Sequence, residues 1–466
     1  MTVNSIACDK DSRKNTDLKQ ILRVLVISYY YPPWNVIGSV RLGKITKYLS
    51  EYDCEPWVLT LETGLFPNAA GLAVEIPDSR IIRANLGSCF TRLVRQRLQN
   101  ISPTLPIVSD NGSIRQRLSS LVMLVLQGLW RYASAQFSDT RFPDRALPWV
   151  QPAIKKGTAL LKEHRFDAIV SSHGPPSSHI VAAALAKKFN LPWIADYRDL
   201  WTQNHFQKRH SLAQWLETRL EKRLLRRASH LTTVSEPLSQ QLRELHRTPV
   251  TVLHNGFDAA DFLLNDVLKT SDKFMIVYTG MIYPGKLDPT PLFAAIRLLY
   301  AKWPEVAKHV EIHFLGTDPS LVAHIAAKSQ INDQVFIHPR LPNREAIRWQ
   351  QTADMLLLLV WDDPVAKGIY TGKVFEYLGA RRPILATGPS GGVIEALLRE
   401  TKSGELVNSA EQAAQMILAW WQVKQRTGST RLPEQADILR PYTRYYQAGI
   451  LAGVLRVAVE NHRHRP

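Results

Sequence analysis

Short apolar runs alternate with amphipathic segments along most of the chain. Residues 21–28 form an apolar, β-branched run in which Arg23 is the only charge, and this pattern predicts a strand buried in a parallel sheet. Residues 40–50 then carry apolar positions at helical spacing, and residues 56–60 return to a strand pattern. The same order recurs with strands at 167–172, 192–195, 230–234 and 250–253 and a helix at 177–189.

A more polar stretch near 258–272 interrupts this alternation, and a second series begins after it. Its predicted strands are 274–279, 310–316, 334–338, 355–360 and 383–387, with helices at 291–302, 319–328 and 373–380. Alternation of this kind is typical of parallel sheets covered by helices. The predicted fold class is therefore α/β, with two Rossmann-like doubly wound domains facing each other across a cleft.

The length of 466 residues fits two domains of similar size with additional segments. We predict the following division: a flexible tail at 1–20, an N-terminal domain at 21–257 with a basic and apolar insertion at about 85–140, a linker at 258–272, a C-terminal domain at 273–430, and a C-terminal helix at 431–466 that packs back on the N-terminal domain.

Loops that follow parallel strands are where such folds bind ligands. In the first domain, Gly38 lies between a predicted strand and helix, where backbone amides can approach an anion, and Arg41 follows in the first helical turn. A turn that only needs Gly and Pro is the alternative explanation for this loop.

A second group of candidates follows two later strands of the first domain. Asp196, Arg198 and Asp199 combine carboxylates with a guanidinium, which can fix one another while leaving an oxygen free to accept a hydroxyl proton. His173 follows the neighbouring strand and is a candidate base or acceptor ligand. A purely structural ion network and a bystander histidine are the alternatives.

The second domain offers two phosphate-type motifs. Gly280 and Lys286 follow its first strand, although Lys286 alone also fits a solvated loop lysine. Thr371, Gly372 and Lys373 stand where a helix is predicted to begin, which suits phosphate oxygens, and Glu376 follows one turn later, where it can accept hydrogen bonds from ribose hydroxyls. A helix cap with an exposed Glu is the alternative.

The net charge of +17 and pI near 9.7 predict an anionic partner such as phospholipid, nucleic acid or a phosphorylated substrate. No nucleic-acid-binding motif is present, so we do not expect nucleic acid. The three cysteines, Cys8, Cys54 and Cys89, have neither metal nor redox spacing, and the polar start lacks a signal-peptide pattern. These features favour a cytoplasmic protein.

The insertion carries a cluster of cations, Arg92, Arg95, Arg97, Arg115 and Arg117, around an apolar segment at 118–130. As a helix this segment is about 20 Å long, against a hydrocarbon core of about 30 Å. It cannot span a membrane, but it can lie in the interface of an anionic leaflet. A buried core helix is the equally weighted alternative.

Taken together, the motifs resemble those of the family-4 retaining glycosyltransferases of GT-B fold, in particular the subgroup of bacterial capsule, exopolysaccharide and lipopolysaccharide assembly. The similarity extends from about residue 23 to 406 and rests on Tyr30-Tyr31-Pro32-Pro33 with Gly38 and Arg41, the block at 196–201, residues 233–235 and 254–258, the loop 280–286, and the run 373–377 leading to 382–384.

The resemblance implies a hexosyltransferase that moves a sugar from a nucleotide-diphosphate sugar to a saccharide or polyprenyl-linked acceptor with retention and without a metal or other cofactor. Lys286 and Lys373 would contact the diphosphate and Glu376 the ribose, while Gly38, His173, Asp196, Arg198 and Asp199 would border the reaction centre. Such an enzyme would be cytoplasmic or peripheral at the inner face of the membrane.

One position departs from the family pattern. Many relatives carry a Glu that contacts the donor sugar eight residues before the ribose Glu, and here that position is Gly368. Asp362 and Asp363 are candidate substitutes. A nucleotide-sugar epimerase and a catalytically silent scaffold or regulator remain as alternatives, and only Gly368 favours the silent scaffold.

Overall fold

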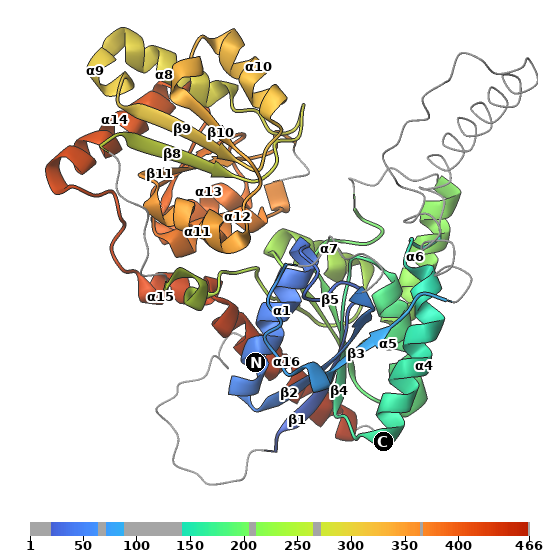
Figure 1. Cartoon of the computed structure of the whole chain (residues 1–466). Helices are drawn as coiled ribbons and strands as arrows, with labels where there is room; N and C mark the ends of the chain where they lie inside the picture. Colours follow the sequence, from blue (N-terminus) through green and yellow to red (C-terminus); the bar gives the residue numbers. More distant parts are fainter. Residues whose placement is uncertain are drawn as a thin grey trace, which may run out of the picture. The chain divides into compact units, whose positions relative to one another are not determined.

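A computed structural model of the chain describes residues 20–63, 71–87, 142–204, 211–263, 272–363 and 367–464. They form two compact units, each built on its own sheet (Figure 1). The first unit takes the described residues of Lys14–Thr232, Gln241–Thr251 and Val454–Pro466, and the second those of Thr233–Gln240 and Val252–Gly453. The predicted fold class of two Rossmann-like α/β domains is confirmed.

Two predicted features lie outside the described residues. Nearly all of the insertion falls within 88–141, including the arginines at 92, 95, 97, 115 and 117 and the apolar segment 118–130, and the predicted tail is described only at Gln20.

The first sheet has, among the described residues, seven strands in the order β3-β2-β1-β4-β5-β6-β7. The pairings β3–β2, β2–β1, β1–β4 and β4–β5 are parallel. Its strand at residues 22–27, paired on both sides, has Val24, Leu25 and Ile27 fully buried, which explains the continuous apolar run. The strands are β1 (Leu22–Ile27), β2 (Cys54–Leu61), β3 (Ile81–Ala84), β4 (Ala168–Ser172), β5 (Trp193–Tyr197), β6 (His230–Thr233) and β7 (Val250–Val252).

The helices of this part of the chain are α1 (Ile37–Leu49), α4 (Leu147–Glu163), α5 (Ser177–Phe189), α6 (Ser211–Leu225) and α7 (Glu236–Leu245). Figure 1 shows α1 on one face of the sheet and the packed pair α4 and α5 on the other. Both faces of the sheet are thereby removed from water.

The second sheet has, within the described residues, six strands in the order β10-β9-β8-β11-β12-β13, and every neighbouring pair is parallel. The strands are β8 (Phe274–Thr279), β9 (Val310–Leu315), β10 (Val335–His338), β11 (Met355–Leu359), β12 (Ile384–Thr387) and β13 (Gly404–Val407). Alternate residues of β8 enter different cores: Phe274, Ile276 and Tyr278 belong to one, and Met275 and Val277 to the other.

The two cores of this sheet are covered by different helices. One set packs on the face of Phe274 and the other on the face of Val277, above and below the sheet in Figure 1. The first set is α8 (Thr290–Lys302), α10 (Pro319–Ser329) and α14 (Ala410–Thr427), with the short α9 (Pro304–Ala307) beside α8, and the second is α11 (Asn343–Thr352), α12 (Gly372–Ala380) and α13 (Val393–Thr401), joined by α15 (Ala436–Leu439).

The last helix, α16 (Arg444–Arg463), is shared by the two units. From residue 454 onward it belongs to the first unit, where Arg456 donates to the Tyr52 carbonyl and His462 Nε2 donates to the Asn190 carbonyl at 2.8 Å. Arg463 lies 3.5 Å from the Asp167 carboxylate. The end of the chain thus contributes to the unit formed by its beginning.

Each strand order reverses next to the first strand of the unit. The chain runs from β1 outward to β2 and β3 and then crosses back to β4 on the other side of β1, and β8 to β11 repeat this path. Ligands of open parallel sheets bind beyond the carboxyl ends of the strands at such switch points. The loops after β1, β4, β8 and β11 are therefore the places to look for a site.

Candidate active site

Asp196, at the end of β5, is a buried anchor of the first unit. Its Oδ1 accepts from Arg41 Nη2 at 2.9 Å and from Thr232 Oγ1 at 2.9 Å, and its Oδ2 accepts from Arg41 Nε at 3.2 Å and Ser172 Oγ at 3.0 Å. Asp196 and Arg41 are each 1% exposed. The expectation that one oxygen stays free to accept a hydroxyl proton is therefore wrong for Asp196.

The same contacts set the charge state of this carboxyl. Burial alone would raise the pKa of Asp196, but Arg41 and the hydroxyls of Thr232 and Ser172 outweigh it and hold the pKa below its usual value. Asp196 is ionised at neutral pH and compensates the buried guanidinium. The structural ion network is the correct interpretation of this pair.

Arg198 contacts two other predicted residues of the first unit, Gly38 and Asp199. Its guanidinium lies against the backbones of Gly38 and Gly174, where a β-carbon would fall 2.5 Å from Nη1 and 2.9 Å from Nη2, respectively. Its Nε donates to Asp199 Oδ2 at 2.9 Å, and the Asp199 side chain is 47% exposed. The loops after β1, β4 and β5 thus meet at one cation, beside a carboxylate that remains accessible.

His173, directly after β4, is positioned mainly by aromatic contacts of its ring. It stacks on Tyr197 with centroids 5.4 Å apart and an interplanar angle of 12°. Neither ring nitrogen has a hydrogen-bond partner among the described residues. Burial and the nearby Arg198 lower the pKa of His173 to about 3. The ring is therefore neutral at physiological pH, and both of its nitrogens are buried.

The segment that carries Arg198 and Asp199 is fixed from α6 by a residue that sequence reasoning missed. Glu221, fully buried, accepts from Tyr197 Oη at 2.9 Å and from the Thr202 backbone amide at 3.3 Å, and also from the Thr202 hydroxyl. One carboxylate therefore holds both ends of the loop 198–201. Its place on the inner face of a helix, 20 residues away, gives no sequence signal.

In the second unit, Lys373 folds back onto the end of β8. Its Nζ donates to Tyr278 Oη at 2.6 Å and lies 4.0 Å from the centroid of that ring. A β-carbon at Gly280 would fall 2.6 Å from Lys373 Cε, so only a glycine leaves room for this packing. Burial lowers the pKa of Lys373 to about 7, and Glu376 opposes that shift.

The amino end of α12 is open in front of Lys373. Gly372 is the first residue of the helix, and a β-carbon built on it would meet nothing within 4 Å. Thr371 caps the helix by position, yet its buried hydroxyl has no hydrogen-bond partner among the described residues. Free amides, a free hydroxyl and a lysine at one helix start suit an anion.

Glu376 lies one turn into α12 and is oriented by Gln350, another residue that sequence reasoning missed. Gln350 Nε2 donates to Glu376 Oε2 at 3.1 Å and to Thr279 Oγ1 at 3.1 Å. Burial raises the pKa of Glu376, opposed by Gln350, Lys373 and Arg444. Gly280, Thr371, Gly372, Lys373 and Glu376 are thus brought together at the ends of β8 and α12.

Lys286 is placed differently. It is exposed in the loop after β8, with Nζ 4.4 Å from the centroid of the Trp361 ring. Trp361 follows β11, the other strand of the switch point, so Lys286 flanks the site without touching Lys373 in any described contact. Gly368 supplies no carboxylate at the position of the family's donor-sugar Glu.

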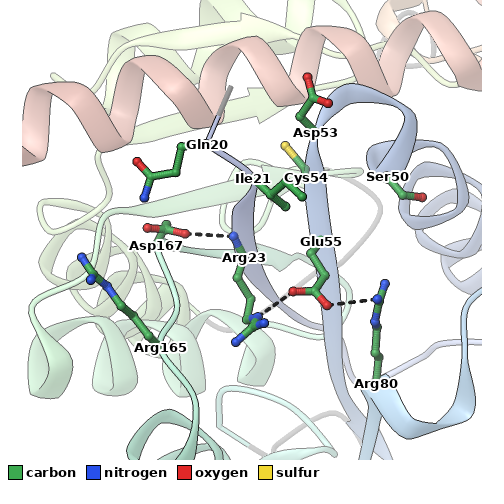
Figure 2. A pocket seen from close by; sticks show the side chains of 10 residues that line it. All are labelled: Gln20, Ile21, Arg23, Ser50, Asp53, Cys54, Glu55, Arg80, Arg165 and Asp167. Atoms are coloured by element: carbon green, nitrogen blue, oxygen red, sulfur yellow. Dashed lines mark hydrogen bonds and ion pairs between the residues drawn. The ribbon is translucent and has the colours of Figure 1, made fainter. Parts of the chain in front are cut away.

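A separate hollow of about 510 Å³ lies at the opposite, amino-terminal edge of the first sheet (Figure 2). Its charges compensate one another: Glu55 lies 2.6 Å from Arg23 and 3.0 Å from Arg80, and Asp167 lies 3.5 Å from Arg463. Burial raises the pKa of the Cys54 thiol to about 11, so it is no nucleophile. This hollow carries no catalytic arrangement.

Comparison with known proteins agrees with this geometry. Residues 130–261 match the sequence profile of Glycosyltransferase Family 4. Anabaena HepE in complex with UDP is similar with a TM-score of 0.59 at 13% identity over 94% of this chain and 100% of that chain. A glycosyltransferase from Rickettsia africae gives 0.59 at 12% over 95% and 100%, and sucrose-phosphate synthase from Thermosynechococcus elongatus gives 0.52 at 13% over 94% and 97%.

The fold is therefore GT-B. A search of curated protein sequences gives no significant match. The sequence similarity to Glycosyltransferase Family 4 is confined to residues 130–261. Among the described residues, no helix is both long and apolar enough to cross a bilayer.

Proposed function

We propose that this chain is a retaining hexosyltransferase of surface-polysaccharide assembly, which transfers a sugar from a nucleotide-diphosphate sugar to a saccharide or polyprenyl-linked acceptor at the inner face of the membrane. The observation that carries the proposal is the cluster at the start of α12, where open amides, Lys373 and the partly buried Glu376 meet the end of β8 at Gly280. The structure of HepE with UDP-glucose, on the same fold, supports it.

On the donor side, the diphosphate would lie on the Gly372 amide, the Thr371 hydroxyl and Lys373, and Glu376 would accept hydrogen bonds from the ribose. Transfer breaks the bond between the anomeric carbon and the diphosphate, so negative charge develops on the departing nucleotide. Lys373 and the helix amides would stabilise that charge without a metal ion, with Lys286 at the flank.

On the acceptor side, Arg198 would bind oxygens of the saccharide or its phosphate, and Asp199 would orient its hydroxyl groups. Neutral His173, stacked on Tyr197 with both nitrogens buried, would support this loop from the protein side. Asp196 and Arg41 would stabilise the fold around this site and would not contact the acceptor. With Gly368 in place of a Glu, recognition of the donor sugar falls to other groups, and Asp362 and Asp363 are the candidates.

A binding measurement tests the donor site. Thermal unfolding of the purified protein would be followed with a panel of nucleoside diphosphates and their sugars, for the wild type, Glu376→Ala and Glu411→Ala. Glu411 is an exposed glutamate of α14, and its removal controls for loss of a surface charge. A ligand at 100 times its dissociation constant adds about 2.7 kcal/mol of stability.

The proposal predicts stabilisation by one nucleotide family, reduced in Glu376→Ala and retained in Glu411→Ala. Stabilisation by none of them in a folded protein would favour the catalytically silent scaffold. Given the preferred donor and an acceptor extract, nuclear magnetic resonance of the product then tests retention, because the coupling constant at the anomeric position distinguishes the two configurations.

A further inference from the structure

The helix α6 (Figure 1) presents an apolar stripe outward. Leu212, Trp215 and Leu216 are 68%, 49% and 43% exposed, respectively. Their spacing of three and four residues places them on one side of the helix. In a helix of a globular protein such a stripe normally faces the core.

Cationic side chains lie on the same side of the helix, directly after the apolar residues. Arg219 and Arg223 are exposed at the next positions of the stripe, and Lys222 is exposed beside them. The Arg219 guanidinium lies 4.0 Å from the centroid of the Trp215 ring, so the apolar and the cationic halves are in direct contact. Two further exposed arginines, Arg226 and Arg227, follow the helix end.

The acidic residues of α6 face the other way. Among the described residues of this helix, the acids are Glu217 and Glu221, and they are 2% and 0% exposed. The helix is therefore turned with its carboxylates towards the protein and with Leu212, Trp215, Leu216 and the cations outside. No acid of α6 offsets the positive charge of the exposed side.

We propose that this side of α6 docks on an anionic phospholipid surface. Leucine and tryptophan side chains partition into the interface between headgroups and acyl chains, and arginines bind the phosphates above them. A second copy of the chain is a poor occupant, because a two-fold contact would bring the cationic rows together with no carboxylate of α6 to compensate them.

Docking at α6 also orients the candidate acceptor loop. Glu221, on the inner side of the same helix, holds the loop 198–201 at Tyr197 and Thr202. The membrane would thereby hold Arg198 and Asp199 at a fixed relation to lipid-linked acceptors. This consequence rests on the proposed function, whereas lipid binding by α6 does not.

Co-sedimentation with vesicles tests the proposal. The full chain at 0.15 M salt would be mixed with vesicles of phosphatidylcholine alone or with 30% phosphatidylglycerol. Arg219→Glu/Arg223→Glu reverses two cations of the stripe, and Leu212→Ser/Leu216→Ser removes its leucines. Lys155→Glu/Lys156→Glu is the matched control, because it changes the charge equally at two exposed positions of α4 in the same unit.

We expect wild type and control to bind only the anionic vesicles, and each α6 variant to bind about tenfold or more weakly. Unchanged binding of both α6 variants would overturn the proposal and point to the arginine-rich insertion. Absence of vesicle binding by the wild type, or a dimer that Leu212→Ser/Leu216→Ser dissociates, would also overturn it. Nucleotide binding is measured on the same variants. If vesicle binding is absent while nucleotide binding is retained, only the lipid proposal is overturned and the proposed function stands.

Discussion

Lys373 packs so closely on Gly280 that a β-carbon at position 280 would fall 2.6 Å from its Cε and 3.0 Å from its Nζ. Gly280→Ala is therefore expected to displace the ammonium group from the start of α12 and to weaken binding of the preferred nucleoside diphosphate about tenfold or more, the effect of losing a charge-assisted hydrogen bond. Isothermal titration calorimetry measures this change.

Gly285→Ala is the matched control for backbone strain. Gly285 lies in the same loop and also has a positive φ, of 72° against 109° for Gly280, but its β-carbon would meet nothing within 4 Å. Both variants lose stability because alanine disfavours this conformation. An equal loss of nucleotide affinity in both would show that strain, and not the displacement of Lys373, is responsible.

The lowered pKa of Lys373, about 7, predicts pH-dependent binding. A bound diphosphate favours the charged lysine, so its pKa rises in the complex and binding takes up a proton above pH 7. Affinity is then expected to fall as the pH rises from 7 to 9, by up to about tenfold per pH unit.

Lys373→Arg separates this effect from titration elsewhere, because arginine stays charged over the whole range. Its affinity is expected to be flat between pH 7 and 9, whatever its absolute value. Titrations in two buffers of different ionisation enthalpy measure the proton uptake directly. Equal pH profiles for the two proteins would contradict the assignment of the titrating group to Lys373.

The buried pair of Asp196 and Arg41 predicts a stability effect. Asp196→Asn leaves a 1%-exposed guanidinium without its counter-charge and is expected to cost about 3–5 kcal/mol in urea unfolding. The partly exposed pair of Glu55 and Arg23 is the comparison, and Glu55→Gln should cost about 1 kcal/mol or less. Similar losses would contradict the anchoring role of Asp196.

The sign of the pH dependence follows from the same pair. Because the pKa of Asp196 is lower in the folded than in the unfolded protein, the stability it contributes is fully present above the unfolded pKa, about 3.9. It is lost as the pH falls through the folded pKa. The difference between wild type and Asp196→Asn is therefore expected to shrink below about pH 4.

Glu221→Gln tests the loop that carries Arg198. A carboxamide has one accepting oxygen, so it cannot serve both Tyr197 Oη and the Thr202 amide. The turnover number with saturating donor is expected to fall on the order of tenfold to a hundredfold, because displacement of a positioned group costs about that much. Tyr197→Phe removes only one of these bonds and should lose less. Donor affinity that falls with turnover would contradict a role confined to the loop.

Hydrophobic patterning predicted most strands of the two sheets and some of the helices that cover them. The predicted helix 177–189 and strand 274–279 agree with α5 and β8 to the residue. The short strand β3, where Arg83 interrupts the apolar pattern, was missed. Helix α6, in which Leu212 and Leu216 face outward and both glutamates face inward, was missed too, as were α4, α7, α11, α13, α14 and strand β13.

For the site, the sequence predicted the loops better than the roles of single residues. Lys373, Glu376 and Gly280 follow strands of the switch point and meet as a group. The role of Asp196 was not predictable, because its hydroxyl partners, Ser172 and Thr232, come from other strands and become neighbours only in the sheet. Long-range partners of this kind leave no local pattern.

The most direct test of the central claim is a crystal structure of the chain with the nucleoside diphosphate that stabilises it most. We predict the terminal phosphate within hydrogen-bonding distance of the Gly372 amide and Lys373 Nζ, with the ribose hydroxyls on Glu376. A nucleotide bound elsewhere on the chain, with the start of α12 unoccupied, would contradict a donor site at this helix start.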